Sequence, residues 1–192
     1  MKIIEPSVEL VDQFSYADIC NKIERAGRVC YQSEPKGKPE DFIRMLIKRG
    51  HESVLEHSSL TFHIICDRAI QNELVRHRLC AFSVESTRYV KYNELTFVNA
   101  SVNISPNWAA YLKGIEDTYI FAVSIGTRPE IARSILPLCL KSELYMTANL
   151  REWRHILKLR TSPKAHPQMR HVAGMILDIF HKNFPVFVED LS

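Results

Sequence analysis

Glycine is scarce in this 192-residue sequence, and long apolar runs are missing altogether. Only six glycines are present, and they form no glycine-rich phosphate loop, which argues against a P-loop NTPase. No apolar stretch is long enough to cross a bilayer. Lys2 is not followed by the long apolar run of a signal peptide. The sequence therefore predicts a cytoplasmic protein with no membrane partner.

Paired cysteines and a strong net charge are also lacking. The five cysteines include no CxxC pair, so neither a disulfide framework nor a zinc knuckle is expected. The formal net charge is only +3, whereas a dedicated nucleic-acid binder usually carries a larger, clustered excess. With 46% hydrophobic residues the chain can bury a sizeable core, and we predict a single domain over residues 1–192.

The order of apolar and polar residues predicts a chain in which helices dominate. Helical patterns are found over 16–31, 39–49, 68–81, 108–122, 129–136, 150–160 and 168–184. Strands are predicted at 2–4 and 60–66, extended chain over 82–92, and a short connection or strand at 144–147. We expect an α+β fold, in which a small, mostly antiparallel sheet is packed with several helices.

A block of charged residues begins on the predicted helix 68–81. Glu73, Arg76, His77 and Cys80 are spaced so that they would share one helical face, and Arg78 flanks them. Surface charge runs are common, so an ordinary ion pair between Glu73 and Arg76 or His77 is the competing interpretation.

An acid, two hydroxyls and a further arginine follow this block at Glu85, Ser86, Thr87 and Arg88. Forked guanidinium donors and hydroxyls are what a phosphate group requires, so the stretch 76–89 predicts a site for anionic ligands. Ser86 could also be a nucleophile. No histidine and aspartate accompany it at a diagnostic spacing, and we interpret it as a hydrogen-bond donor.

Two histidines flank acidic residues in the segment 51–57. The zinc motif HExxH requires a helix and a different order and spacing, so no metal is expected in this protein. The competing interpretation of the segment is a turn with capping side chains.

The predicted helix 150–160 carries a third group of polar residues. Asn149 followed by Glu152 matches a capping box. Arg160 falls on the apolar stripe of this helix, where a buried guanidinium would need an anionic or carbonyl-rich partner. Arg151 and His155 line an adjacent face. For Asn149 the competing role is the cap alone, and for Arg160 it is an internal salt bridge at the helix C-terminus.

Four ordered blocks of this sequence resemble the flavin-dependent thymidylate synthase family. Arg76-His77-Arg78, then seven residues and Ser86, resembles the family signature. The blocks 51–57, 132–137 and 149–160 also resemble family segments in the right order. The resemblance runs from about residue 28 to about residue 173, which makes it far more specific than the triplet alone.

The resemblance implies an enzyme that converts dUMP to dTMP without an enzyme nucleophile. It implies FAD as cofactor, NADPH and 5,10-methylenetetrahydrofolate as co-substrates, and a homotetramer with active sites between subunits. The implied flavin contacts are Ser53, Arg76, His77, Arg78, Asn149, Arg151 and His155. The implied dUMP contacts are Glu73, Arg76, Glu85, Ser86, Thr87, Arg88, Arg133 and Arg160. Arg160 is implied to be the catalytic residue, which faces the uracil and stabilises its N3-deprotonated form.

The sequence departs from the family pattern at three places. Glu73 stands where many members have glutamine, the stretch 79–84 lacks an Asn-Glu pair, and His155 stands where some members have asparagine. Two rival interpretations remain. One is a basic nucleotide- or nucleic-acid-binding module without catalysis, which would show a wide basic surface and a steep salt dependence. The other is a protein that kept the fold and lost the activity.

Overall fold

The computed structural model describes residues 1–30, 32–99 and 107–191. Within it the chain forms two compact units. Unit 1 comprises Met1–Ser7, Ile64–Arg76 and Ser83–Tyr145, and unit 2 comprises Val8–His63, His77–Phe82 and Met146–Ser192. Four of the strands, β2, β3, β4 and β6, contribute residues to both units.

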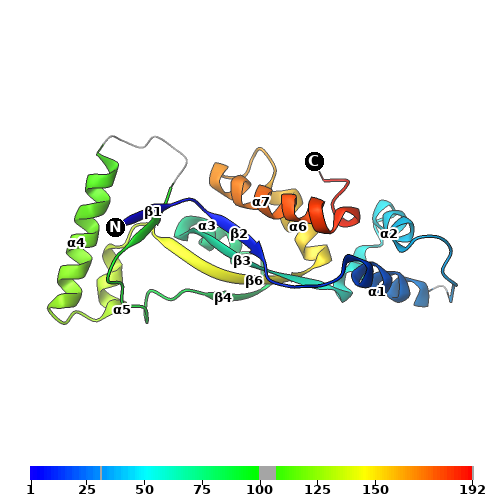
Figure 1. Ribbon diagram of the computed structural model, residues 1–192, viewed down its shortest axis with the longest axis horizontal. Helices are drawn as coiled ribbons and strands as arrows, with labels where there is room; N and C mark the ends of the chain where they lie inside the picture. Colours follow the sequence, from blue (N-terminus) through cyan, green and yellow to red (C-terminus); the bar gives the residue numbers. More distant parts are fainter. Residues whose placement is uncertain (31, 100–106, 192) are drawn as a thin grey trace. The chain divides into compact units, whose positions relative to one another are not determined.

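Helices and strands follow one another in short runs along the chain (Figure 1). The helices are α1 (Tyr16–Val29), α2 (Pro39–Lys48), α3 (Arg68–Leu74), α4 (Trp108–Ser124), α5 (Pro129–Ala132), α6 (Leu150–Arg160) and α7 (Pro167–Asn183), with short 3₁₀ turns η1 (Glu52–His57), η2 (Arg133–Ile135) and η3 (Pro185–Phe187). The strands are β1 (Lys2–Ile4), β2 (Ser7–Leu10), β3 (Ser59–Asp67), β4 (Ala81–Val84), β5 (Thr96–Val98) and β6 (Lys141–Asn149). Within the described ranges, no helix combines the length and the apolar character that crossing a membrane requires.

The strands form a small antiparallel sheet in the order β2-β3-β6-β4, and β1 pairs in parallel with β5. The alternation along β6 buries Ser142, Leu144, Met146 and Ala148. The α+β prediction is confirmed. The sequence pattern missed β2 and β5 and reduced β6 to 144–147, because serine and alanine at its inward positions carry little hydrophobic signal.

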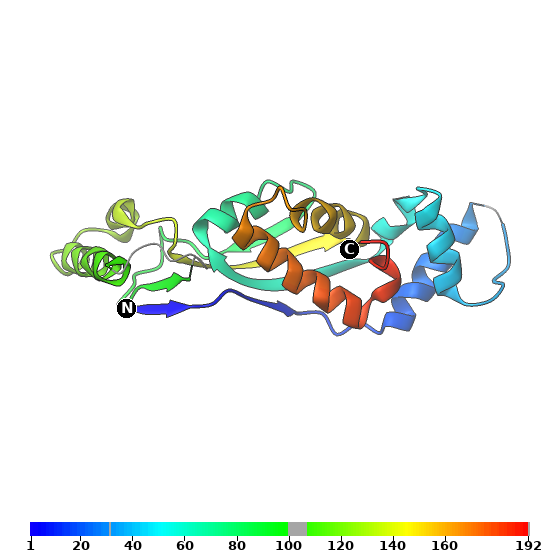
Figure 2. The same cartoon turned by 90° about the horizontal axis from the view of Figure 1, so that it is seen from above.

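Unit 2 is built on a cluster of aromatic side chains. Trp153 of α6 lies edge-on to Phe62 of β3, with ring centroids 4.9 Å apart, and Phe180 of α7 stacks on Phe62 at 5.8 Å. The indole Nε1 of Trp153 donates to the carbonyl oxygen of Leu60 at 2.9 Å. Helices α6 and α7 lie side by side in both views (Figures 1 and 2). The predicted helices 150–160 and 168–184 are thus confirmed within one residue.

The apolar core of unit 1 lies between β5 and α4. Leu95, Phe97, Leu112 and Tyr119 are buried there together with Leu140. The helix predicted over 108–122 is confirmed.

The apolar spacing that predicts this helix runs through Trp108, Tyr111, Leu112, Ile115, Tyr119 and Ala122, and the buried stripe of α4 agrees with it only in part. The stripe centres on Leu112, Glu116, Tyr119 and Val123, whereas Tyr111 is 65% exposed. Tyr111 precedes Leu112 by a single helical step, about 100° around the axis, and so falls off the stripe.

The predicted helix 68–81 is wrong in its second half. Helix α3 ends at Leu74, and the backbone N–H of Arg76 turns back to the carbonyl of Glu73. His77 is then buried against the side chain of Arg160, and strand β4 begins at Ala81. The helix ends because of a contact between residues far apart in the sequence, and the local pattern carries no signal for it. The helical face that Glu73, His77 and Cys80 were predicted to share is therefore not formed.

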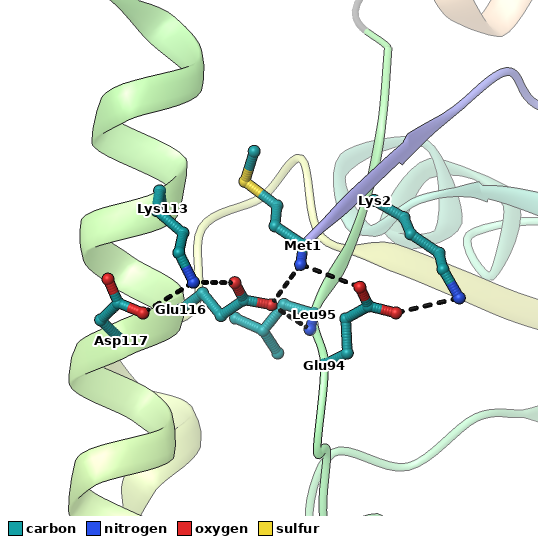
Figure 3. A network of polar contacts seen from close by, with 7 residues as sticks. All are labelled: Met1, Lys2, Glu94, Leu95, Lys113, Glu116 and Asp117. Carbon is teal, nitrogen blue, oxygen red and sulfur yellow. Dashed lines mark hydrogen bonds and ion pairs between the residues drawn. The ribbon is translucent and has the colours of Figure 1, made fainter.

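A buried carboxylate organises the polar part of unit 1 (Figure 3). Glu116 accepts from Lys113 Nζ at 2.9 Å, from the α-amino group of Met1 at 2.9 Å and from the N–H of Leu95 at 2.8 Å. Burial opposes ionisation, but the donors from Lys113, Met1 and Leu95 outweigh it and lower the pKa of Glu116 to about 2.

We expect Glu116→Gln to lower the free energy of unfolding at pH 7 by about 2 kcal/mol, since a buried charged acceptor is lost. The folded-state pKa lies below the ordinary value of 4.5. The stabilisation is therefore complete above about pH 4.5 and is lost as the pH falls toward 2. Urea unfolding of both proteins at pH 7 and pH 3 should show a stability difference that shrinks at the lower pH. A difference that is equal or larger at pH 3 would contradict this assignment.

Candidate functional site

The start of α6 is fixed by its cap. The side-chain oxygen of Asn149 accepts from the backbone N–H of Glu152 at 2.8 Å, so Asn149 is an N-cap, as predicted. Trp153 and Ile156 then turn into the core of unit 2. Arg151 and His155 are left on the exposed side, where they border a cavity.

This cavity has a volume of about 750 Å³, which suits a sizeable ligand. All its walls belong to unit 2. The lining side chains are mostly polar: Glu52, Glu56, Leu79, Asn149, Arg151, Glu152, Arg154, His155, Lys158, Asp190 and Leu191. The cavity is thus not purely cationic, because four acidic side chains accompany its three basic ones.

Two of the basic side chains are engaged by the acids. Arg154 is the buried arginine of α6, and it makes a bidentate contact with Asp190 at 2.7 and 2.8 Å and reaches Glu52 at 3.2 Å. These hydrogen bonds hold the pKa of Asp190 below its usual range. Arg151 contacts Glu56 at 2.5 Å. The sequence predicted a buried arginine with an anionic or carbonyl-rich partner at Arg160 of this helix. The structure has that arginine at Arg154, and Arg160 is only half-buried.

Arg160 lies at the end of α6 against His77. Its Nε–H donates to Nε2 of His77 at 3.0 Å. On the other side of the ring, Nδ1 lies 3.8 Å from Oε1 of Glu152. Burial lowers the pKa of His77 to about 4, and the charges of Arg160 and His155 act in the same direction. His77 is therefore neutral at pH 7.

The side chains of His77, Glu152 and His155 have the composition of a metal site. Their potential ligand atoms lie within 4.8 Å of one another. A metal would need a lone pair on His77. Nε2 already accepts from Arg160, and in the neutral ring the remaining proton is then on Nδ1. Arg160 thus competes directly with a cation for His77.

Cys80 follows in the same turn region of unit 2. Burial raises the pKa of its thiol to about 12, and the carboxylate of Glu152 adds to the effect. The side chain is therefore a thiol at neutral pH and a poor nucleophile.

Only some of the predicted flavin contacts lie together at the cavity. Asn149, Arg151 and His155 line the cavity, and the Glu152 beside His77 lines it too. Ser53 and Arg78 are exposed residues of unit 2 that are not among the cavity walls. Arg76 is exposed at the end of a segment of unit 1.

The predicted dUMP contacts of unit 1 form a small cluster after β4. Thr87 is buried and accepts from Arg133 Nη1 at 3.4 Å. Arg88 Nε donates to Glu130 at 3.3 Å, and the hydroxyl of Ser86 accepts from the backbone N–H of Arg88 at 3.3 Å. The loop that follows β4 and the region α5–η2 therefore bring two arginines and two hydroxyls into one neighbourhood.

Two acids of the predicted dUMP set lie differently. Glu85 accepts from the hydroxyl of Tyr92 at 2.7 Å and pairs with Lys141 at 3.0 Å, so both its oxygens have partners inside unit 1. Glu73 is half-buried in the last turn of α3.

Residues 9–186 match the family model described as "Thymidylate synthase complementing protein". The chain belongs to this family. The chain is also similar to named proteins over most of its length. It is 33% identical over 191 residues to a probable flavin-dependent thymidylate synthase of Mycobacterium phage D29, covering 88% of this chain and 81% of that protein.

Similar proteins are also found in a cellular organism and among the solved structures. A flavin-dependent thymidylate synthase of Thermococcus onnurineus is 38% identical over 144 residues, which cover 70% of this chain and 59% of that protein. The crystal structure of the UMP/dUMP methylase PolB from Streptomyces cacaoi, bound with 5-Br dUMP, is 28% identical. It matches with a TM-score of 0.82 over 98% of this chain and 96% of that one. The predicted family and the prediction of an enzyme are confirmed.

The sequence interpretation missed two side chains of the site region. Arg154 lines the cavity and is paired with Asp190, and Glu152 faces His77 in addition to its place in the capping-box pattern. Glu152 carried a signal, since a carboxylate directly before the apolar Trp153 on a helix that packs on the core needs a partner if it is buried. That partner, His77, is 75 positions away in the sequence and could be found only from the fold.

Proposed function

We propose that this protein is a flavin-dependent thymidylate synthase that methylates dUMP to dTMP. The observation that carries the proposal is the similarity over nearly the whole chain to a methylase solved with a dUMP analogue bound. The phage and archaeal relatives named as flavin-dependent thymidylate synthases support it. The proposal includes FAD as the flavin, NADPH as reductant, 5,10-methylenetetrahydrofolate as carbon donor and a cytoplasmic homotetramer with sites between subunits. The single-domain organisation over 1–192 also stays a prediction.

The cavity of unit 2 fits the flavin in size and donor chemistry. Arg151, His155 and Lys158 follow one another at helical spacing along its wall, so their donors can serve a pyrophosphate. Asn149 places the N-terminus of α6 at the same wall, where the helix dipole favours an anion. Glu56 would have to share Arg151 with the ligand. Ser53, Arg76, His77 and Arg78 complete the proposed flavin contacts.

The cluster in unit 1 is proposed to hold the nucleotide. Arg88 and Arg133 are forked donors, and Ser86 and Thr87 supply hydroxyls, which together suit a phosphate monoester. Glu85 would act there through Tyr92 and Lys141 rather than as a direct donor, because an ionised carboxylate cannot donate.

Arg160 is proposed to act on the uracil ring. An arginine side chain offers a planar, positively charged fork of donors. A fixed positive charge beside the base stabilises the N3-deprotonated form, and the charge in that form increases the nucleophilicity of C5. The contact with His77 restrains the Nε side of the guanidinium, which reduces the reorganisation needed when charge develops.

The reaction balances without a nucleophile from the protein. The methylene carbon of the folate forms a bond to C5 of uracil, the C5 proton is lost, and tetrahydrofolate leaves. The flavin, when reduced by NADPH, supplies the hydride that turns the methylene into a methyl group. The high pKa of the Cys80 thiol is consistent with this scheme, because the scheme asks for no thiolate.

Flavin binding is the first test of the proposal. After incubation with FAD and removal of the unbound cofactor, the purified protein should retain the visible flavin band, and dUMP should change that band in a saturable manner. UMP is the comparison ligand for dUMP, because the similar methylase is named for both UMP and dUMP. A protein that binds no flavin under any condition, yet binds oligonucleotides in a steeply salt-dependent way, would instead favour the nucleic-acid-binding module.

A further inference from the structure

Three side chains of unit 2 form a polar chain that links the two ends of α6. Arg160 at its C-terminal end donates to Nε2 of His77 at 3.0 Å, and Nδ1 of His77 lies 3.8 Å from Oε1 of Glu152 in the first turn. His77 and Glu152 are 6% and 8% exposed. Both therefore face the interior, where unscreened charges act strongly on their neighbours.

The protonation state of His77 follows from its partners. A guanidinium carries a single hydrogen on Nε, and the geometry directs it at Nε2 of the imidazole. Nε2 must therefore present its lone pair, because a second hydrogen would set two donors against each other. Since His77 is neutral at pH 7, its one ring proton is on Nδ1.

Glu152 is the group that favours this tautomer. Its carboxylate faces Nδ1 at a distance longer than a hydrogen bond but within the reach of an ion pair. A negative charge there attracts the N–H dipole of Nδ1 and would repel a lone pair. The opposite tautomer would turn Nε2–H toward Arg160 and break the contact that restrains the guanidinium.

We propose that Glu152 is a positioning residue, which holds His77 in the Nδ1–H tautomer and through it fixes the guanidinium of Arg160. This inference rests on the proposed function only for its effect on turnover. The tautomer and the Arg160–His77 contact are properties of the protein alone. Glu152 itself touches no substrate in this account.

The test combines nitrogen NMR with kinetics. In protein labelled with ¹⁵N-histidine, the signals of His77 are identified by their absence in His77→Asn. The wild-type ring should show the pattern of an Nδ1–H tautomer, whereas Glu152→Leu should show a mixed or Nε2–H pattern. Glu152→Asp, which keeps a carboxylate on a shorter stem, should restore most of the wild-type pattern. Glu189→Gln is the matched control, because Glu189 pairs with the exposed Arg44, is not among the cavity walls and should change nothing.

Turnover supplies the second readout. With the flavin-loaded protein, Glu152→Leu should lower kcat roughly 10- to 100-fold, since small displacements of a positioned group are costly. The KM for dUMP should change less than about threefold if the carboxylate acts through Arg160. Glu152→Asp should recover most of the loss. A merely structural role would lower Tm and leave the tautomer unchanged.

The two readouts separate the possible failures. A wild-type ring in the Nε2–H tautomer, a Glu152→Leu spectrum like the wild type, or an altered tautomer with unchanged kcat would each overturn the inference. If the wild type binds flavin but forms no dTMP, the proposed function fails, and the tautomer spectra still decide whether Glu152 fixes His77.

Discussion

Arg160→Ala is expected to lower the rate of dTMP formation by at least about 10²–10³-fold, the usual cost of removing one preorganised donor at a developing charge. The variant removes both the fixed charge and the hydrogen bond to Nε2 of His77. Folding should be largely preserved, because Arg160 is half-buried at the last position of α6 and is not one of the buried core residues of unit 2. The rate is measured by single turnover with flavin-loaded protein.

Two companions make the Arg160 result specific. Arg160→Lys keeps a charge but loses the planar fork, and it should recover only part of the rate. Arg44→Ala removes an exposed arginine that pairs with Asp41 and Glu189, and its turnover should equal that of the wild type. Wild-type turnover in Arg160→Ala would refute the role assigned to this side chain.

Trp153→Ala should produce the largest loss of stability, about 3–5 kcal/mol in the free energy of unfolding. The indole is fully buried against Phe62 and Phe180, and its Nε1 donates to the carbonyl of Leu60. Truncation leaves a cavity and an unpaired carbonyl in the core that holds α6. Because α6 carries both Glu152 and Arg160, flavin binding should weaken along with stability.

The matched control lies six residues further along the same helix. Leu159 is 48% exposed, so Leu159→Ala should change the unfolding free energy by no more than about 0.5 kcal/mol. Denaturant unfolding of both variants under identical conditions measures the difference. Equal free energies of unfolding for the two variants would show that the aromatic cluster is not a main source of the stability of unit 2.

The long helices were predictable because their signals are local. The cap at Asn149 and the apolar spacing that follows it define α6, and the structure confirms both. Helix 68–81 failed for the opposite reason. Its local pattern does not indicate that the chain leaves the helix after Leu74. The chain there is instead held by the contact between His77 and Arg160, which are 83 positions apart.

The candidate site was predictable in its residue types but not in its pairings. The arginines and hydroxyls of 76–89 stand out in the sequence, and the structure gathers Ser86, Thr87 and Arg88 near Arg133. The sequence does not reveal that Arg154, rather than Arg160, is the deeply buried arginine. Both lie on helix α6, and burial is decided by the carboxylate of Asp190 and the carbonyl of Phe187, which come from the C-terminal segment.

The formation of dTMP tests the proposed function most directly. The purified protein, supplied with FAD, NADPH, dUMP and isotopically labelled 5,10-methylenetetrahydrofolate, should yield dTMP that carries the label in its methyl group. Omission of the flavin or of the reductant should abolish the product. A protein that binds FAD and dUMP but forms no labelled dTMP, or that forms it equally well without flavin, would contradict the account.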